Sequence, residues 1–463
     1  MERTATHVIL THAEYDSLIE MIKKLEARIV ELESRLNKNS SNSSKPPSSD
    51  GLKKVIKNNR EQSENKQGAQ PGHKGSTLKM VDHADKFEYH KVSGTCECGE
   101  NLETQTERSI VRKQEFELPE KLIEVIEHHI EIIKCKCGRK HYAPCELKGN
   151  VQYGTKFKSL MVYLNQYQFI PFERLQEISE DCFGMSISDG VLDASNQTCY
   201  EQLAQTEEQI KQTLLESPVI NNDETGIRCE GKTQWVHSTS TPGLTHYSIQ
   251  EKRGNQGMDT IGILPHYTGT SIHDRWASYD NYPCTHGLCN AHLLRDLKYL
   301  YEEMNCEWAQ PMIALLVQAH EAKKQDQLNA LTIESIETRY IKIVQQGIKN
   351  EPEQKNREKI KRGRIPKSKS RLLLEVFANR SEQVLLFLYD KQVPFDNNLA
   401  ERDLRMMKLK QKISGCFRSR NGAEVFCRIR SYISSARKNG YQILDAIEKA
   451  LIGNPIQLIP AEQ

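Results

Sequence analysis

The segment from Asn37 to Gly75 limits the fold most strongly, because it contains almost no large apolar residues. It consists mainly of Asn, Ser, Lys, Gly and Pro. Such a segment cannot bury enough apolar surface to offset the entropy lost on ordering, so we predict a flexible linker. Its lysines and arginines either contact DNA phosphates or are simply solvated. The linker separates a short N-terminal region from the rest of the 463-residue chain, whose length is typical of about three domains.

The composition argues against two classes of protein. No apolar run approaches the roughly 20 residues that cross a bilayer, so a membrane function is not expected. The 13 cysteines are an odd number, and no basic segment followed by an apolar one begins the chain, so neither export nor a disulfide framework is expected. The 64 basic and 62 acidic residues nearly cancel, so any nucleic-acid surface must come from local clustering.

Before the linker, apolar residues recur at alternating spacings of four and three, which is the seam of a heptad repeat. They are Leu18, Ile22, Leu25, Ile29, Leu32 and Leu36. Charged residues fill the other faces. The pattern predicts a helix that either forms a two-stranded coiled coil or packs on its own chain, and we favour the coiled coil.

Two Cys-x-Cys-Gly motifs, separated by 36 residues, lie in a region of predicted short strands. Their four thiolates, from Cys96, Cys98, Cys135 and Cys137, could close a tetrahedral structural Zn²⁺ site. Such a site would supply folding energy that a small module lacks. The loops are one residue shorter than the usual Cys-x-x-Cys, and His141 and Cys145 are substitute ligands. The alternative is a set of buried free cysteines.

The next region, residues 151–215, is predicted to be helical. Phe172 to Cys182 forms one helix, Gly184 supplies a turn, and Ser188 can cap a second helix. This is the outline of a helix-turn-helix that could read DNA, although two helices joined by a glycine turn also occur in other helical domains.

An alternating α/β pattern begins at Val219. Strands are predicted at Val219 to Asn222, Gln234 to Thr239, His246 to Gln250 and Gly269 to His273. A helical stretch from Leu288 to Gln346 follows, and then a basic piece from Glu351 to Arg371 before further helices. The helical block has the appearance of an insertion in an α/β domain.

Three carboxylates stand at ends of these elements. Asp223 opens the motif Asp-Glu-Thr-Gly after one strand, Asp274 ends another strand, and Glu401 lies about one turn into a helix that Asn397 or Asn398 can cap. Oxygen ligands from separate elements suit Mg²⁺ or Mn²⁺, and two such ions roughly 4 Å apart can promote phosphoryl transfer. Among 62 acidic residues, solvated carboxylates are the alternative.

Basic residues are concentrated between Arg402 and Lys438, directly after Glu401. This stretch could contact DNA phosphates or could be a solvated helix face. The candidates for DNA binding are Arg402, Arg405, Lys408, Lys410, Lys412, Arg418 and Arg420. A separate Cys-x-x-His pair, Cys289 and His292, supplies only half a zinc site, so we favour packing of a helix on the sheet for it.

Several of these motifs, in this order, resemble the transposase of the insertion-sequence-66 family of bacterial mobile elements. The resemblance runs nearly end to end and is carried by the heptad helix, the linker with Gly68 to Gly75, the cysteine pairs, Asp223 to Gly226, and Asn397 to Arg402. The family commonly has Cys-x-x-Cys pairs, so the shorter loops here bear on zinc occupancy.

The resemblance implies an α/β RNase H-like catalytic core with a DDE triad of Asp223, Asp274 and Glu401. It implies the following organisation: coiled coil 1–37, basic linker 38–80, zinc-binding-like module 81–150, helical DNA-binding region 151–215, catalytic core 216–290 and 391–435, helical insertion 291–390, and C-terminal helix and tail 436–463.

The implied function is that of a DNA transposase in the bacterial cytoplasm, associated with the nucleoid. It would bind transposon ends, hydrolyse the 3′ strand ends and join them to target DNA with two Mg²⁺ or Mn²⁺ ions. The implied assembly is a homo-oligomer on DNA, with small accessory proteins of the same element as further partners. The alternatives are a DNA-binding regulator that no longer cuts and a nuclease that cuts without joining.

Overall fold

The structure is a computed structural model that describes residues 2–3, 8–9, 11–36, 78–104, 109–147, 149–351 and 367–458. The predicted linker therefore lies almost entirely outside the described residues, as does most of the basic piece after Glu351. The chain divides into two compact units. One contains Met1–Lys57, Leu147–Ser179 and Ser186–Gln463, and the other contains Asn58–Glu146 and Glu180–Met185.

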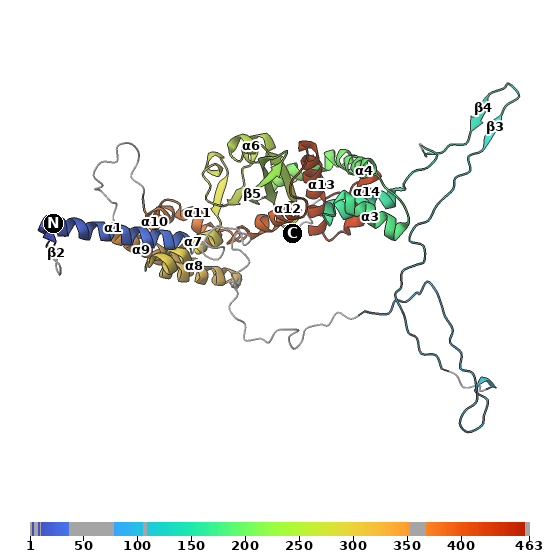
Figure 1. The fold of residues 1–463 in the computed structure, drawn as a ribbon, viewed down its shortest axis with the longest axis horizontal. Coiled ribbons are helices and arrows are strands. Elements are labelled where there is room, and N and C mark those ends of the chain that lie inside the picture. The colour runs from blue at the N-terminus through green and yellow to red at the C-terminus, as the bar shows by residue number, and fades with distance from the viewer. Residues whose placement is uncertain are drawn as a thin grey trace. The chain divides into compact units, whose positions relative to one another are not determined.

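A mixed five-stranded sheet organises the larger unit, with strand order β7-β6-β5-β8-β9 (Figure 1). Its strands are β5 Val219–Cys229, β6 Lys232–Ser240, β7 Thr245–Gln250, β8 Thr270–His273 and β9 Thr285–Leu288. The first three form an antiparallel meander, whereas β8 and β9 run parallel to β5. The four predicted strands are present, and β5 and β6 are longer than predicted. The fifth, β9, was not predicted because Thr-His-Gly-Leu offers only one large apolar residue.

Further helices precede, interrupt and follow these strands. They are α2 Thr155–Val162, the π-helical η3 Tyr163–Tyr167, α3 Phe172–Phe183, α4 Asp189–Gln202, α5 Ala204–Glu216, α6 Asn255–Ile261, α12 Asn398–Ser414, α13 Arg420–Lys438 and α14 Ile443–Leu451. Contacts link α12 to β5 and β6, and α13 to β7. One apolar core, with Ile210, Ile220, Ile433 and Ile447, joins α5 and the sheet to α13 and α14.

The turn predicted between two helices is present at Gly184, whose φ of +64° suits glycine. Ser188 caps α4, since its hydroxyl accepts a hydrogen bond from the Val191 amide at 3.4 Å.

Between β9 and α12, the described residues form a helical block. It contains α7 Asn290–Met304, α8 Ala309–Lys324, α9 Ala330–Asn350, α10 Lys369–Asn379 and α11 Ser381–Tyr389. The stretch predicted as helical from Leu288 is thus broken, and Leu288 itself ends β9. Asn305 ends α7 in the left-handed conformation, and the Asn329 side chain caps α9. A second core joins the block to the sheet through Ile272 and Leu288.

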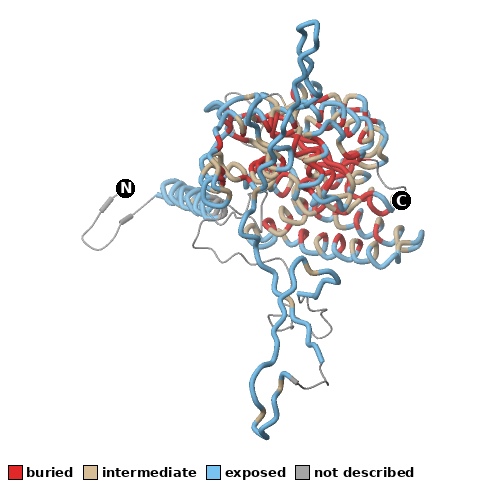
Figure 2. Tube along the Cα trace, turned by 90° about the vertical axis from the view of Figure 1, so that its right-hand side faces the viewer, coloured by how far each residue is buried: buried red, intermediate tan, exposed pale blue. Residues whose placement is uncertain are grey.

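The smaller unit has little regular structure in its described part. It contains η2 Leu102–Thr104 and an antiparallel hairpin of β3 Ile132–Lys134 and β4 Lys140–Tyr142. Most described residues there are exposed (Figure 2). The described part of the predicted β module therefore contains one hairpin and no apolar core. Apolar side chains such as Val111 and Val125 are exposed there.

The N-terminal residues form a short pair of strands, β1 Glu2–Arg3 and β2 Val8–Ile9, followed by α1 His12–Leu36. This helix agrees with the predicted heptad helix. Its seam residues are exposed, for example Leu25 at 57% and Ile29 at 54%. The coiled coil itself therefore stays a prediction.

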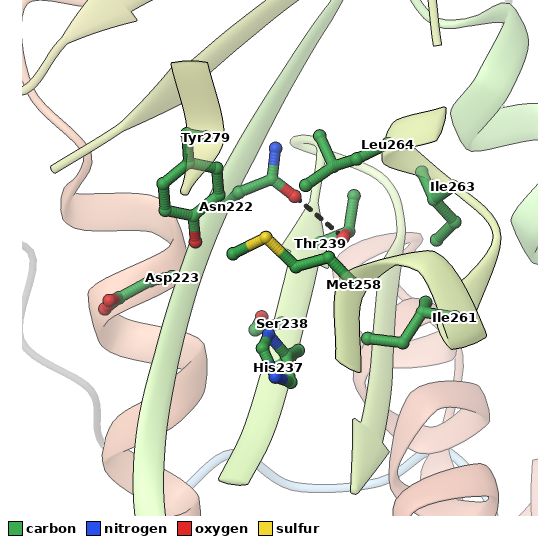
Figure 3. A pocket seen from close by; sticks show the side chains of 10 residues that line it. All are labelled: Asn222, Asp223, His237, Ser238, Thr239, Met258, Ile261, Ile263, Leu264 and Tyr279. Atoms are coloured by element: carbon green, nitrogen blue, oxygen red, sulfur yellow. Dashed lines mark hydrogen bonds between the residues drawn. The ribbon is translucent and has the colours of Figure 1, made fainter. Parts of the chain in front are cut away.

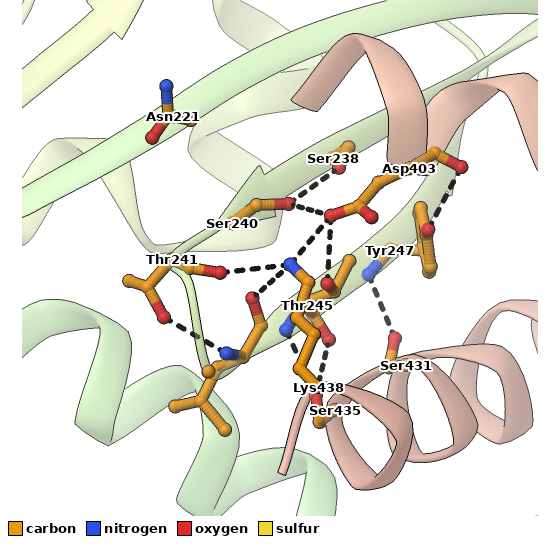
Figure 4. A network of polar contacts seen from close by, with 12 residues as sticks. Asn221, Ser238, Ser240, Thr241, Thr245, Tyr247, Asp403, Ser431, Ser435 and Lys438 are labelled. Atoms are coloured by element: carbon orange, nitrogen blue, oxygen red, sulfur yellow. Dashed lines mark hydrogen bonds and ion pairs between the residues drawn. The ribbon is translucent and has the colours of Figure 1, made fainter. Parts of the chain in front are cut away.

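A buried ion pair fixes α12 and α13 against the sheet (Figure 4). The carboxylate Oδ2 of Asp403, on α12, accepts hydrogen bonds from Ser240 at 2.7 Å and Thr245 at 2.9 Å. The same oxygen pairs with Lys438 Nζ, on α13, at 2.8 Å. The Asp403 backbone carbonyl accepts a further bond from the Tyr247 hydroxyl at 3.0 Å. One carboxylate thus joins two helices to β6 and β7.

Replacing Asp403 with Ala should destabilise the fold, because the Lys438 ammonium would be left buried without its counter-charge. We expect a loss of about 3 kcal/mol or more in the free energy of unfolding, measured by urea denaturation. Arg402→Ala, on the exposed side of the same helix, is the control and should change it by less than about 0.5 kcal/mol. Equal losses for the two variants would contradict this role.

Candidate active site

Strand register brings Asp223 and Asp274 to the same level of the sheet. In the parallel pair of β5 and β8, Asn221 lies opposite Ile272, so continuing that register places Asp223 opposite Asp274. Asp274 follows the last residue of β8, and its Oδ1 accepts a hydrogen bond from the Trp276 amide at 2.8 Å. Asp223 and Asp274 therefore lie on neighbouring segments where the β5–β8 pairing ends. The sequence placed Asp223 after its strand, but β5 continues to Cys229, so Asp223 lies within it.

The start of α12 brings Glu401 toward these aspartates. Asn397, 1% exposed, donates from its amide to the Asn222 carbonyl oxygen at 2.8 Å. Its side-chain oxygen accepts a bond from the Asn221 amide, also at 2.8 Å. Since side chains alternate along a strand, Asn221 and Asp223 point to the same face of β5, the face on which α12 lies. Glu401 is one turn into that helix.

The capping prediction for this helix needs a correction. Asn397 occupies the N-cap position, but its side chain does not cap the helix. The Asn397 side chain instead forms hydrogen bonds with buried polar groups on β5. The Asp396 carboxylate accepts a hydrogen bond from the Asn398 amide at 3.0 Å in its place.

The charges of Asp274 and Glu401 both act on Asp223. Burial, followed by the negative charges of Glu224 and Asp274, raises the pKa of Asp223 well above its usual value. The charge of Glu401 adds to this rise in pKa, and a hydrogen bond from the Glu224 amide at 2.9 Å opposes it. Asp223, Asp274 and Glu401 thus interact electrostatically as one acidic cluster, although within the described residues their oxygens do not all lie within 4.8 Å of one another.

Side chains from α7 surround Glu401. His292 Nδ1 lies 3.6 Å from Glu401 Oε1, and Arg295 Nη2 lies 3.6 Å from Oε2. Burial lowers the pKa of His292, against the attraction of Glu401. Glu401 Oε1 and His292 Nδ1 are both buried without a hydrogen-bond partner among the described residues. An orphaned carboxylate oxygen here is the environment that a cation would complete.

Cys289 lies next to this pair. Ligand atoms of Cys289, His292 and Glu401 are all within 4.8 Å of one another, and this is the one group of three or more such ligands among the described residues. However, the thiol accepts a hydrogen bond from the Asn397 amide at 3.2 Å, and burial raises its pKa to about 12. A neutral thiol that supports the start of α12 agrees with the packing role favoured from the sequence.

A second group of polar residues, not predicted from the sequence, adjoins Asp223. Glu224 accepts hydrogen bonds from the Tyr279 hydroxyl at 2.5 Å and from Arg253 Nε at 2.8 Å. The motif Asp-Glu-Thr-Gly includes Glu224, but nothing in the sequence predicted its partners. The sequence did indicate that His292 and Arg295 lie side by side, since residues three apart on a helix share a face.

The cavity beside Asp223 is too small for a substrate (Figure 3). Its volume is about 10 Å³, room for one water molecule. It is lined by Asn222, His237, Met258 and Tyr279, among others. Burial lowers the pKa of His237 to about 4, so this imidazole is neutral near pH 7. This cavity therefore does not hold the substrate of the acidic cluster.

The predicted DNA-binding residues divide into two sets. Arg402, Arg405, Lys412 and Arg418 are exposed. Lys408 is exposed too, although its Nζ donates to the Gly226 carbonyl oxygen at 2.5 Å.

The other two predicted residues are partly buried. Lys410 lies over the ring of Phe426, with Nζ 5.8 Å from the centroid. Arg420 pairs with Glu424 at 2.7 Å and donates to Gln234 at 2.7 Å, so it joins α13 to β6. These internal contacts compete with a DNA role for Arg420.

The two cysteine motifs fold into matching turns in the smaller unit. The Gly99 amide donates to the Cys96 carbonyl, and the Gly138 amide donates to the Cys135 carbonyl, both at 2.8 Å. Each glycine has a positive φ, +95° and +89°. Among the described residues, however, the four thiols do not form one ligand group.

Sequence comparison identifies the family. Residues 150–425, more than half of the chain, match the transposase IS66 family. The chain belongs to the IS66 transposase family. Residues 6–79 also match a family of unknown function, DUF6444. A comparison with curated proteins gave no match.

Membership of the IS66 family makes the protein a DNA-processing enzyme at a coarse level and makes DNA its expected partner. Transposases of the DDE class generally use divalent metal ions. The mixed α/β fold with a five-stranded sheet is compatible with an RNase H-like core. No helix within the described ranges is both long and apolar enough to cross a membrane.

Proposed function

We propose that this IS66 family transposase hydrolyses the 3′ strand ends of its insertion sequence and joins them to target DNA. Asp223, Asp274 and Glu401 would hold two Mg²⁺ or Mn²⁺ ions for this phosphoryl transfer. The observation that carries the proposal is that Asp223 within β5, Asp274 directly after β8 and Glu401 in the first turn of α12 interact electrostatically.

The residues of this cluster fit divalent cations. Their donors are carboxylate oxygens, which suit hard cations. Glu401 Oε1 is buried without a partner among the described residues, and Asp223 sits among three other acids. When bound, such ions lower the pKa of water and offset charge that develops on the phosphate. The same cluster without cations carries strong mutual repulsion.

The protein side chains would orient the reacting groups. Arg295 and His292 hold Glu401 from the α7 side, and Asn397 fixes the helix that carries it. Arg402 and Arg405 follow Glu401 on the exposed part of α12. Their exposure supports a role in contacting phosphates of the DNA strand.

Recognition of the transposon ends is proposed for the regions that precede the sheet. The helix-turn-helix outline of α3 and α4 supports a DNA-reading role for residues 151–215. The matching turns of the two cysteine motifs support a structural Zn²⁺ on Cys96, Cys98, Cys135 and Cys137.

Charge placement on α1 supports a parallel two-stranded coiled coil as the link between protomers. In heptad notation Ile22 and Ile29 take position a and Leu25 takes position d, a combination that favours two strands. Arg28 takes position g and Glu33 position e, so in a parallel pair Arg28 faces Glu33 of the partner subunit. An antiparallel pair would place glutamates opposite one another.

The triad assignment predicts loss of chemistry without loss of DNA binding. Asp223→Ala, Asp274→Ala and Glu401→Ala should each slow cleavage and joining of the element's own end by roughly a thousandfold or more. Labelled DNA in Mg²⁺ or Mn²⁺ measures both products, and a gel shift measures binding. Glu334→Ala, at an exposed position of α9, is the control. Full activity of any triad variant would remove that residue from the site, and cleavage without joining would indicate a nuclease.

The raised pKa of Asp223 predicts that metal binding strengthens with pH. Its pKa is higher in the folded than in the unfolded chain, so the related stability is full below the unfolded pKa and is lost as pH rises through the folded pKa. Since Mg²⁺ must displace the proton, its stabilisation should be larger in mildly alkaline than in mildly acidic buffer. Melting temperatures with and without Mg²⁺ test this. Asp223→Asn should reduce the difference, and identical Mg²⁺ shifts in both proteins would argue against the site.

The coiled-coil proposal predicts that seam variants dissociate the DNA-free protein. Ile22→Asp should convert a dimer to a monomer in analytical ultracentrifugation, whereas Lys23→Asp, outside the seam, should not. Arg28→Glu and Glu33→Arg should each weaken the dimer, and the double variant should restore it. An unchanged dimer in Ile22→Asp would show that another surface holds the protomers.

A further inference from the structure

Arg253 lies in the connection between β7 and α6, beside the acidic cluster. Its Nε donates to Glu224 Oε1 at 2.8 Å, and its Nη2 lies 2.7 Å from the same oxygen. The guanidinium also stacks on two indole rings, 4.1 Å from the centroid of Trp276 and 5.1 Å from that of Trp235. The group is thus held both along one edge and by ring contacts, which fixes its orientation.

The partner of Arg253 is itself saturated. The Glu224 side chain is 1% exposed, and its other oxygen accepts the Tyr279 hydroxyl at 2.5 Å. The Arg253 side chain, in contrast, is 37% exposed. A guanidinium has five N–H donors, and the hydrogen bond recorded for Arg253 within the described part of the chain uses only the edge facing Glu224. Further N–H donors therefore remain on a side chain that is more than a third exposed.

Arg253 is connected to both aspartates of the cluster by short routes. Trp276, on which it stacks, donates its backbone amide to Asp274. Glu224, to which it is bonded, directly follows Asp223 on β5. Because neighbouring residues of a strand point to opposite faces, Glu224 places Arg253 on the face of β5 away from α12. Glu401 and the exposed arginines of α12 approach from the other face.

We propose that Arg253 binds a backbone phosphate of the DNA strand that lies against the acidic cluster, with Glu224 and Trp276 as positioning residues. This inference rests on the proposed function, since it takes DNA as the substrate of that cluster. A planar guanidinium offers two parallel N–H donors to phosphate oxygens, a geometry that lysine lacks. If Arg253 served only to neutralise Glu224, it would need neither unpaired N–H donors nor stacking on tryptophan rings.

The test probes single phosphates. Labelled duplexes carrying the element's end are prepared with one phosphate at a time replaced by uncharged methylphosphonate, and affinities are measured without divalent metal. For the wild type, one or two positions next to the cleaved bond should lose affinity by about tenfold or more, the size of a charge-assisted hydrogen bond. Arg253→Gln should bind the unmodified DNA correspondingly more weakly and show no further loss at those positions.

Two further variants keep the result interpretable. Arg253→Gln leaves Glu224 buried without its cation, so the double variant Arg253→Gln, Glu224→Gln removes both charges and should give the same methylphosphonate profile as the single variant. Arg253→Lys should regain only part of the affinity. Arg339→Gln, an exposed arginine of α9, is the matched control and should keep the wild-type profile.

An unchanged methylphosphonate profile in both Arg253→Gln proteins would overturn the inference, even if overall affinity fell. The outcome is separable from that of the proposed function, because the binding scan needs no cleavage. If Asp223→Ala abolishes cutting while the methylphosphonate profile of Arg253→Gln equals that of the wild type, only the Arg253 inference fails. If the wild type binds but never cuts its end, the proposed function fails and the scan still reports the Arg253 contact.

Discussion

The arrangement of the acidic cluster depends on the buried amide of Asn397. This side chain bonds to Asn221 and to the backbone of Asn222, residues more than 170 positions earlier in the chain. The helical block between β9 and α12 would otherwise leave Glu401 with no fixed relation to β5. Leaving any buried partner of such an amide unsatisfied costs about 1–3 kcal/mol, so the contact specifies one position of α12. The Asp403 network then holds the remainder of that helix against β6 and β7.

The cationic side chains of the basic stretch after Glu401 divide into those that pair within the fold and those that are exposed. Arg428 pairs with Glu207, Arg430 packs over Tyr167, and Lys438 pairs with Asp403. These groups are paired or packed within the fold, although in the sequence they belong to the same basic stretch as Arg402 and Arg405. The charge available to DNA is therefore smaller than the composition of the run suggests, and it is concentrated on the exposed face of α12.

The parts of the fold that the sequence predicted are those determined by short-range residue patterns. The β5 to β8 strands, the glycine turn before α4 and the Ser188 cap follow from periodicity and capping chemistry. Strand β9 did not, because its fit depends on tertiary packing: a Cβ at Gly287 would lie 2.5 Å from Ile272 Cδ1. Asp274 directly follows a strand and Glu401 lies in the first turn of a helix, as the sequence indicated, whereas Asp223 lies within β5 and not after a strand. The partners of Glu224 were not predicted, because pairing across distant segments leaves no periodic signal, whereas His292 and Arg295 share a helix face but nothing in the sequence linked that face to Glu401.

The charge balance of the site leads to a final point about how it would operate. Arg253 and Arg295 each lie against a carboxylate of the cluster, so they orient acids without removing the excess negative charge around Asp223. A phosphate backbone arriving at this cluster would add further negative charge. On the proposed function, binding of DNA and of divalent cations must therefore be mutually favourable, since each reduces the electrostatic cost of the other and the coupling is reciprocal.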